Sequence, residues 1–232
     1  MLLTPDDWEI IRLSLKVSTV AVASTLPIAF GLAWLLARGR FPGKILLDSM
    51  IHLPLVLPPV VTGWLLLLAF GTTGPAGRLL EDWFGITFMF RWTGAALAAA
   101  VMALPLMVRA IRLSLEAVDR RLEGAARTLG ASPLHAFFTI TVPLSLPGIA
   151  AGAVLGFARS IGEFGATITF VSNIPGETRT LPLAIYSELQ IPGADANVAR
   201  LAIISVLLSV AALVASEALA RRAGGRRGRH VL

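Results

Sequence analysis

Two opposite charges stand in an apolar stretch of the sequence, where charged side chains are costly. The stretch FARSIGEFGATITF, residues 157–170, carries Arg159 and Glu163 four positions apart. On a helix this spacing puts both side chains on one face, so that they can form an ion pair. A charge inside a bilayer has to face protein or water, and such residues mark pathways and relays. We interpret the pair as a candidate gate, or as a contact that holds helices in register.

Several other chemistries have no support in the sequence. The chain has no cysteine, which excludes disulfides and thiol catalysis. The Gly-Lys dipeptide at residues 43–44 is not part of a phosphate-binding loop, and no H-E-x-x-H motif occurs. The three histidines (His52, His135 and His230) are scattered. We therefore expect no metal site, no bound cofactor and no enzyme that acts alone.

The composition is typical of a membrane protein. Apolar residues make up 56% of the chain, charged residues only 15%, and the mean hydropathy is +0.77. The pI of about 11.1 does not indicate a nucleic-acid partner, because the basic residues lie between long apolar runs. The acidic start, MLLTPDDWEI, lacks the positive region of a cleavable signal peptide.

Five apolar segments are long enough to cross a bilayer, which takes roughly 20 helical residues. We predict an all-α polytopic membrane protein with about five transmembrane helices in a single domain, residues 1–232. The predicted spans cover residues 10–38, 46–70, 92–114, 138–165 and 198–220.

Most of the 20 basic residues fall in three segments: the 38–44 turn, residues 109–127 and the tail from residue 221. In a five-span chain these segments share one side of the membrane, which the positive-inside rule makes cytoplasmic. We therefore expect the N-terminus outside and the C-terminus in the cytoplasm.

The second span, IHLPLVLPPVVTGWLLLLAFG, contains Pro54, Pro58 and Pro59. Proline removes backbone donors and interrupts a helix. In hydrocarbon the freed carbonyl groups are tolerated where protein or a wet cavity satisfies them. A packing kink is the alternative, but three prolines in six residues favour a pathway-lining position. We expect Pro58, Pro59, Thr62, Thr167 and Thr169 to line the pathway, although span threonines often bond to their own helix.

The segment between the third and fourth spans predicts a short amphipathic helix outside the bilayer, in a loop at about residues 119–137. Apolar residues recur at helical spacing from Leu115 to Leu129. Gly130 fits the left-handed position after a helix end, and Ser132-Pro133 fits the start of the next helix. On periodicity alone, a helix lying against lipid headgroups is the favoured interpretation.

The residues of this loop resemble the signature of ATP-binding-cassette importer permeases. That signature reads Glu-Ala-Ala, three residues, Gly, nine residues, then Ile-x-Leu-Pro. The matching residues here are Ala125, Ala126, Gly130, Ile140 and Pro143. The sequence departs from it in having Gly124 where the acidic residue stands, Glu123 one place earlier, and Val142 in place of Leu.

The resemblance implies a type I ABC importer permease fold with a coupling helix that docks on a cytoplasmic ABC ATPase dimer. The residues it places in that contact are Glu123, Gly124, Ala125, Ala126, Arg127 and Gly130. It also implies a second copy of the chain, an extracytoplasmic binding protein and a location in a prokaryotic inner membrane. ATP and Mg would be bound by the ATPase.

Three stretches also resemble the permease subunits of molybdate transporters: LPLVLPPVVTGW, RSIGEFGATITF and, as the most discriminating, FVSNIPGETRTLP. The implied cargo is molybdate, with tungstate as a near equal in size and charge. Sulfate and thiosulfate permeases share an Arg-x-x-Gly-Glu-aromatic-Gly arrangement, so that they remain an alternative. Recognition of the anion would lie mainly in the binding protein.

Two other kinds of function compete with this interpretation. In a secondary transporter driven by an ion gradient, Arg159 and Glu163 would relay protons or ions. In a membrane scaffold, the basic ending RRAGGRRGR would bind anionic lipid. The five-span count, the absence of a detectable inverted repeat and the match of the cytoplasmic loop count against the secondary transporter. The basic tail is interpreted as an orientation signal with some lipid contact rather than as evidence for a scaffold.

Overall fold

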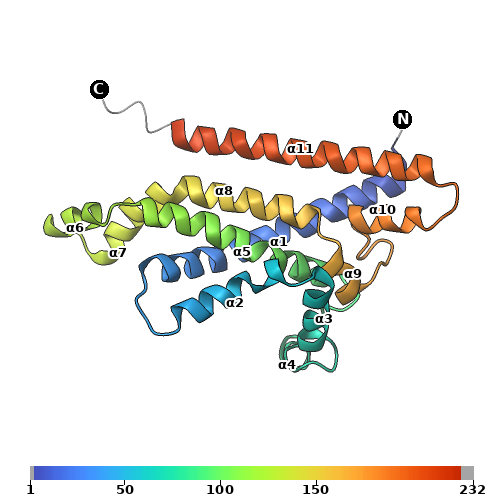
Figure 1. Cartoon of the computed structure of the whole chain (residues 1–232), viewed down its shortest axis with the longest axis horizontal. Helices are drawn as coiled ribbons and strands as arrows, with labels where there is room; N and C mark the ends of the chain where they lie inside the picture. Colours follow the sequence, from blue (N-terminus) through green and yellow to red (C-terminus); the bar gives the residue numbers. More distant parts are fainter. Residues whose placement is uncertain (1–2, 226–232) are drawn as a thin grey trace.

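The computed structural model describes residues 3–225, and within this range every regular element is helical. The elements are α1 (Pro5–Arg38), α2 (Lys44–Val56), α3 (Pro59–Phe70), α4 (Pro75–Phe84), α5 (Trp92–Ala117), α6 (Arg120–Thr128), α7 (Pro133–Ala136), a π-helical turn (Phe137–Thr141), α8 (Val142–Ile161), α9 (Gly165–Val171), α10 (Leu181–Leu189) and α11 (Asp195–Gly225). Figure 1 shows α1, α5, α8 and α11 running along the long axis of the molecule, with α6 and α7 together at one end. The basic tail from residue 226 onward lies outside the described residues.

The first helix begins earlier than the predicted first span. Thr4 accepts a hydrogen bond from Asp7 N at 3.2 Å, and the Asp7 carboxylate accepts one from Thr4 N at 2.8 Å. This reciprocal capping box satisfies two backbone donors at the helix start. Pro27 lies inside α1 without ending the helix.

The core forms where α1, α5 and α8 pack together, and a row of glycines makes the closest approach possible. Gly148, Gly152 and Gly156 recur every four residues along α8 and face α5. A Cβ atom added at Gly152 would lie 3.0 Å from Ile111 Cγ1, and one at Gly156 would lie 2.6 Å from Met107 Sδ. Small residues at this spacing let helix backbones approach in a membrane, where van der Waals packing drives association.

Four described helices are long and apolar enough to cross a membrane, and the number is five if one bent helix pair counts as a single span. The pair is α2 and α3, between which the chain bends by 116°. The predicted second span, residues 46–70, is therefore two helices. Pro58 and Pro59 supply no N–H groups at the break, whereas Pro54 lies within α2.

The chain also breaks within the predicted fourth span, residues 138–165. The helix α8 ends at Ile161, and α9 begins at Gly165. The two predicted charges, Arg159 and Glu163, therefore lie at a break between helices.

An ion pair joins the N-terminal parts of α1 and α11, and α10 is hydrogen-bonded to α1 close by. Arg200 Nε of α11 lies 3.1 Å from Asp7 Oδ2 of α1, and the Asp7 side chain is only 3% exposed. Ser14 Oγ of α1 accepts a hydrogen bond from Leu181 N at 2.8 Å, where α10 begins. These contacts fix α10 and α11 on α1.

Candidate functional site

The ion pair predicted from the sequence forms at the end of α8. Arg159 Nη1 lies 2.6 Å from Glu163 Oε2. The other carboxylate oxygen, Oε1, accepts a hydrogen bond from Ala166 N at 2.8 Å, in the first turn of α9. Glu163 therefore joins two helices, because each of its oxygens is held by a different one.

The two partners differ strongly in exposure. The Glu163 side chain is 2% exposed and that of Arg159 is 26% exposed. A buried carboxylate is tolerated only with a partner charge and hydrogen bonds, which Arg159 and Ala166 provide. Arg159 can exchange part of its contact for water, whereas Glu163 cannot.

The break between α2 and α3 lies against the break between α8 and α9. A Cβ atom added at Gly165 would come within 2.7 Å of Pro59 Cβ. One turn further on, a Cβ atom at Gly63 would come within 2.6 Å of Ala166 O and 2.8 Å of Thr169 Cβ. The absence of side chains at these glycines allows α3 and α9 to pack directly on each other.

The three threonines proposed for the pathway lie on these two helices. Thr62 of α3 is buried, and its hydroxyl has no hydrogen-bond partner within the part of the chain that the structure describes. Thr167 of α9 is also buried. Thr169 Oγ1 donates to Gly165 O at 2.9 Å, so this hydroxyl is used by its own helix. The structure thus gathers the predicted pathway residues around one junction, which we call the break junction: residues 57–63 and 159–169.

At the other end of α8 lies the segment predicted to couple to an ATPase, residues 119–137, which we call the coupling segment. It has the turn that the sequence predicts. Asp119 caps α6 by accepting a hydrogen bond from Arg121 N at 2.9 Å. Gly130 has φ +91°, and Ala131 N donates to Ala126 O at 3.0 Å, which is the Schellman ending of a helix. Ser132 then caps α7 through a 3.2 Å hydrogen bond from His135 N.

The helix α6 buries none of its residues in this chain. The predicted apolar stripe is divided, because α5 ends at Ala117 and leaves Leu115 buried while Leu129 is 89% exposed. A Cβ atom added at Gly124 or Gly130 would meet nothing within 4 Å. The chain's own packing therefore does not require a small residue at Gly124, which leaves this surface open to a partner.

Glu123 differs from the other residues predicted for coupling because it is bound within the chain. Its Oε1 atom lies 3.0 Å from Arg38 Nη2 at the end of α1, and it also accepts a hydrogen bond from the hydroxyl of Thr141 in the π-helical turn. This carboxylate therefore ties the coupling segment to α1 and to the start of α8.

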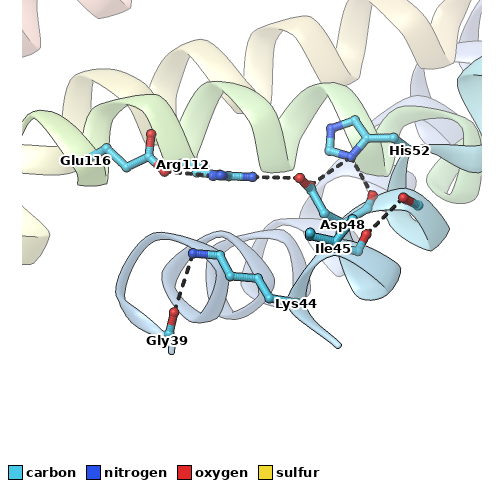
Figure 2. A network of polar contacts seen from close by, with 8 residues as sticks. Gly39, Lys44, Ile45, Asp48, His52, Arg112 and Glu116 are labelled. Carbon is cyan, nitrogen blue, oxygen red and sulfur yellow. Dashed lines mark hydrogen bonds and ion pairs between the residues drawn. The ribbon is translucent and has the colours of Figure 1, made fainter. Parts of the chain in front are cut away.

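A polar network that the sequence did not reveal holds α2 against α5. Arg112 Nη1 of α5 lies 3.0 Å from Asp48 Oδ2 of α2, and Arg112 Nε lies 2.8 Å from Glu116 Oε1. His52 Nδ1 lies 3.2 Å from Asp48 Oδ1. Figure 2 shows Arg112 lying between the two carboxylates. This network holds the N-terminal half of α2 against α5, the helix that precedes α6.

The most discriminating sequence stretch, residues 170–182, contains the loop between α9 and α10, which is held by hydrogen bonds among its own residues. The fully buried Thr178 donates to Ser172 O at 3.0 Å and accepts a hydrogen bond from Ile174 N at 2.8 Å. Arg179 Nε donates to Asn173 Oδ1 at 3.2 Å. These side chains position the connection between α9 and α10. Among the described residues, no group of three acidic or histidine side chains could hold a metal ion.

Comparison with known proteins identifies the family. Residues 26–225 match the family described as the binding-protein-dependent transport system inner membrane component. The chain is 62% identical over 229 residues to the molybdenum transport system permease protein ModB of Escherichia coli (strain K12), which covers 99% of this chain and 100% of that protein. It is 40% identical over 200 residues to the sulfate transport system permease protein CysT of Salmonella typhimurium, covering 83% of this chain and 72% of that protein.

Solved structures support the fold. A bacterial ABC transporter that imports the acidic polysaccharide alginate matches with a TM-score of 0.73 at 18% identity, covering 95% of this chain and 80% of that chain. The inward-facing MetNI methionine ABC transporter matches with a TM-score of 0.73 at 17% identity, covering 96% of this chain and 99% of that chain. The predicted type I ABC importer permease fold is confirmed, and the chain belongs to the family of binding-protein-dependent transport system inner membrane components.

Proposed function

We propose that this chain is the permease subunit of an ATP-driven importer of molybdate, with tungstate as a second cargo. The observation that carries the proposal is the 62% identity to a molybdenum permease over 229 residues. Sulfate or thiosulfate is the alternative cargo, supported by the lower identity of 40% to a sulfate permease. Both alternatives share a tetrahedral oxyanion as substrate class.

We propose further that two copies of the chain form the pathway and that an ABC ATPase dimer and a binding protein complete the machine. The exposed α6 is the docking surface for the ATPase, through Gly124, Ala125, Ala126, Arg127 and Gly130. ATP and Mg are held by the ATPase. The N-terminus lies outside and the C-terminus in the cytoplasm, in agreement with the distribution of basic residues.

A movement of α6 can reach the break junction through covalently connected and closely packed helices. The coupling segment joins α5 directly to the π-helical turn and α8, and the glycine row holds these helices together. A displacement of α6 would therefore move the far end of α8, where Arg159 and Glu163 hold the break junction. ATP and the loaded binding protein shift the equilibrium because each binds one state of the cycle more tightly.

The test is transport by the complete complex in vesicles. Permease, ATPase and binding protein are reconstituted, and uptake of labelled molybdate is measured with tungstate, sulfate or thiosulfate as competitor. We expect binding-protein-stimulated ATP turnover and competition by tungstate at lower concentrations than by sulfate. Stronger competition by sulfate would favour the alternative cargo. Uptake that persists without the ATPase under a proton gradient would instead favour a secondary transporter.

A further inference from the structure

A pocket of about 550 Å³ lies between the last turns of α1 and the coupling segment, away from the break junction. Its apolar walls include Phe30, Trp34, Leu134 and Phe137. The ring centroid of Phe137 lies 6.1 Å from that of Phe30 and 6.0 Å from that of Trp34, both edge to face. Leu134 is 70% exposed, so one apolar wall is in contact with the surroundings of the protein.

The residues that α1 contributes to the pocket change in character along the helix. Phe30, Trp34 and Arg38 are four residues apart and therefore share one face. The order is apolar ring, amphipathic ring and charge, as expected where a helix passes from hydrocarbon through the interface to water. A pocket lined by this series lies at the depth where a phospholipid has its upper acyl chain, glycerol and phosphate.

The rim of the pocket is positively charged. Arg38 and Arg120 face it with one carboxylate, Glu123, which is already held by Arg38 and Thr141. Arg38 Nε is buried and has no hydrogen-bond partner among residues 3–225. Arg120 is exposed, and its Nη2 donates to Ala37 O at 3.3 Å. Glu123 balances the charge of Arg38 only. A ligand with an anionic group would balance the charge of Arg120 and would accept hydrogen bonds from the N–H groups of its guanidinium.

We propose that this pocket binds an anionic phospholipid. One acyl chain packs against the aromatic walls, and the phosphate lies beside the guanidinium of Arg120. Basic pockets between helices at the membrane surface favour anionic headgroups in this way. A phosphatidylcholine headgroup fits less well, because it carries a cationic group toward the arginines. The bound lipid would brace α1 against the coupling segment, since the pocket is formed by both.

Trp34 provides a reporter for this site. In the full chain, the other four tryptophans are changed to phenylalanine; a control chain keeps only Trp64, which is 51% exposed on α3 and does not line the pocket. Both are reconstituted in phosphatidylcholine vesicles that contain 10 mol% (roughly one lipid in ten) of either brominated phosphatidylglycerol or brominated phosphatidylcholine. We expect brominated phosphatidylglycerol to quench Trp34 about twice as strongly as brominated phosphatidylcholine, and to quench Trp64 equally.

Two neighbouring arginines separate a defined site from general surface charge. Arg120→Gln should abolish the preference of Trp34 for brominated phosphatidylglycerol, because Arg120 lines the pocket. Arg121→Gln is the matched control, since Arg121 is exposed and does not line it. Equal quenching of Trp34 by the two lipids would overturn the proposal. It would also be overturned by equal effects of the two substitutions, which would point to the surface potential alone.

Discussion

Arg159 and Glu163 form an ion pair of 2.6 Å at the point where α8 ends, and Glu163 also accepts a hydrogen bond from the first turn of α9. The pair therefore bridges a break in the chain. The same break packs against the break between α2 and α3. A change in this ion pair would therefore alter the packing of four helices: α2, α3, α8 and α9. Such a junction is suited to a gate with two discrete arrangements.

Removal of Arg159 should cost more than neutralisation of Glu163. Arg159→Gln leaves a buried carboxylate without its counter-charge, whereas Glu163→Gln keeps an oxygen for Ala166 N and leaves a partly hydrated arginine. We expect a cost for Arg159→Gln somewhat below the roughly 3–5 kcal/mol found for fully buried pairs, and a smaller cost for Glu163→Gln. The double variant should be more stable than Arg159→Gln alone.

Thermal unfolding of the purified chain and oxyanion uptake by the complex measure these effects. Arg12→Gln is the control, because Arg12 is an exposed arginine on α1. If Arg159→Gln resembled this control in both stability and uptake, the pair would have no role in the break junction.

The anchoring of α2 can be separated from local charge pairing on α5. Asp48 and Glu116 both contact Arg112 (Figure 2), but Asp48 joins two helices whereas Glu116 lies one turn away on the same helix. We expect Asp48→Asn to lower the free energy of unfolding by about 1 kcal/mol, and Glu116→Gln by a few tenths, as for helix-surface pairs. Denaturant unfolding of the full chain compares the two; equal effects would show that the contact between helices adds nothing.

How much of this arrangement the sequence could predict depends on the range of the interactions. The turn at Gly130 and the restart at Ser132-Pro133 follow from backbone and capping preferences that act over a few residues, and the structure confirms both. The break before α3 follows from two consecutive prolines, for the same local reason.

The break after Ile161 could not be predicted in this way. The predicted fourth span, residues 138–165, is apolar enough to cross the bilayer as one helix. The helix nevertheless ends close to Glu163, which has one partner on each side of the break. Asp48 and Arg112 are 64 residues apart, so their contact depends on the packing of two helices. The glycine row was not predicted from the sequence, because the spacing of its residues does not indicate which helix they pack against.

The glycine row predicts a strong dependence on position. Gly148→Ala would force its Cβ onto Ser114 Cβ, whereas Gly31→Ala in α1 meets nothing within 4 Å. We expect Gly148→Ala to destabilise the chain by about 1–3 kcal/mol through overpacking. Gly31→Ala should stabilise it by up to about 1 kcal/mol, since alanine favours a helix over glycine. Thermal unfolding in detergent measures both, and equal stability of the two variants would contradict the close packing of α5 and α8.

A substitution at Gly124 distinguishes a docking helix from a helix that lies on lipid. The site is open in this chain, so Gly124→Val should leave the stability of the isolated chain unchanged or slightly higher, because valine favours a helix over glycine. Against a closely packed ATPase, however, the added side chain would clash at the centre of α6. We therefore expect the variant to fold, to lose copurification with the ATPase by tenfold or more (about 1.4 kcal/mol), and to lose binding-protein-stimulated ATP turnover. Pull-down and ATP-turnover measurements test this, with unfolding of the free chain as the control. Normal copurification and turnover of Gly124→Val would mean that this face of α6 does not contact the ATPase.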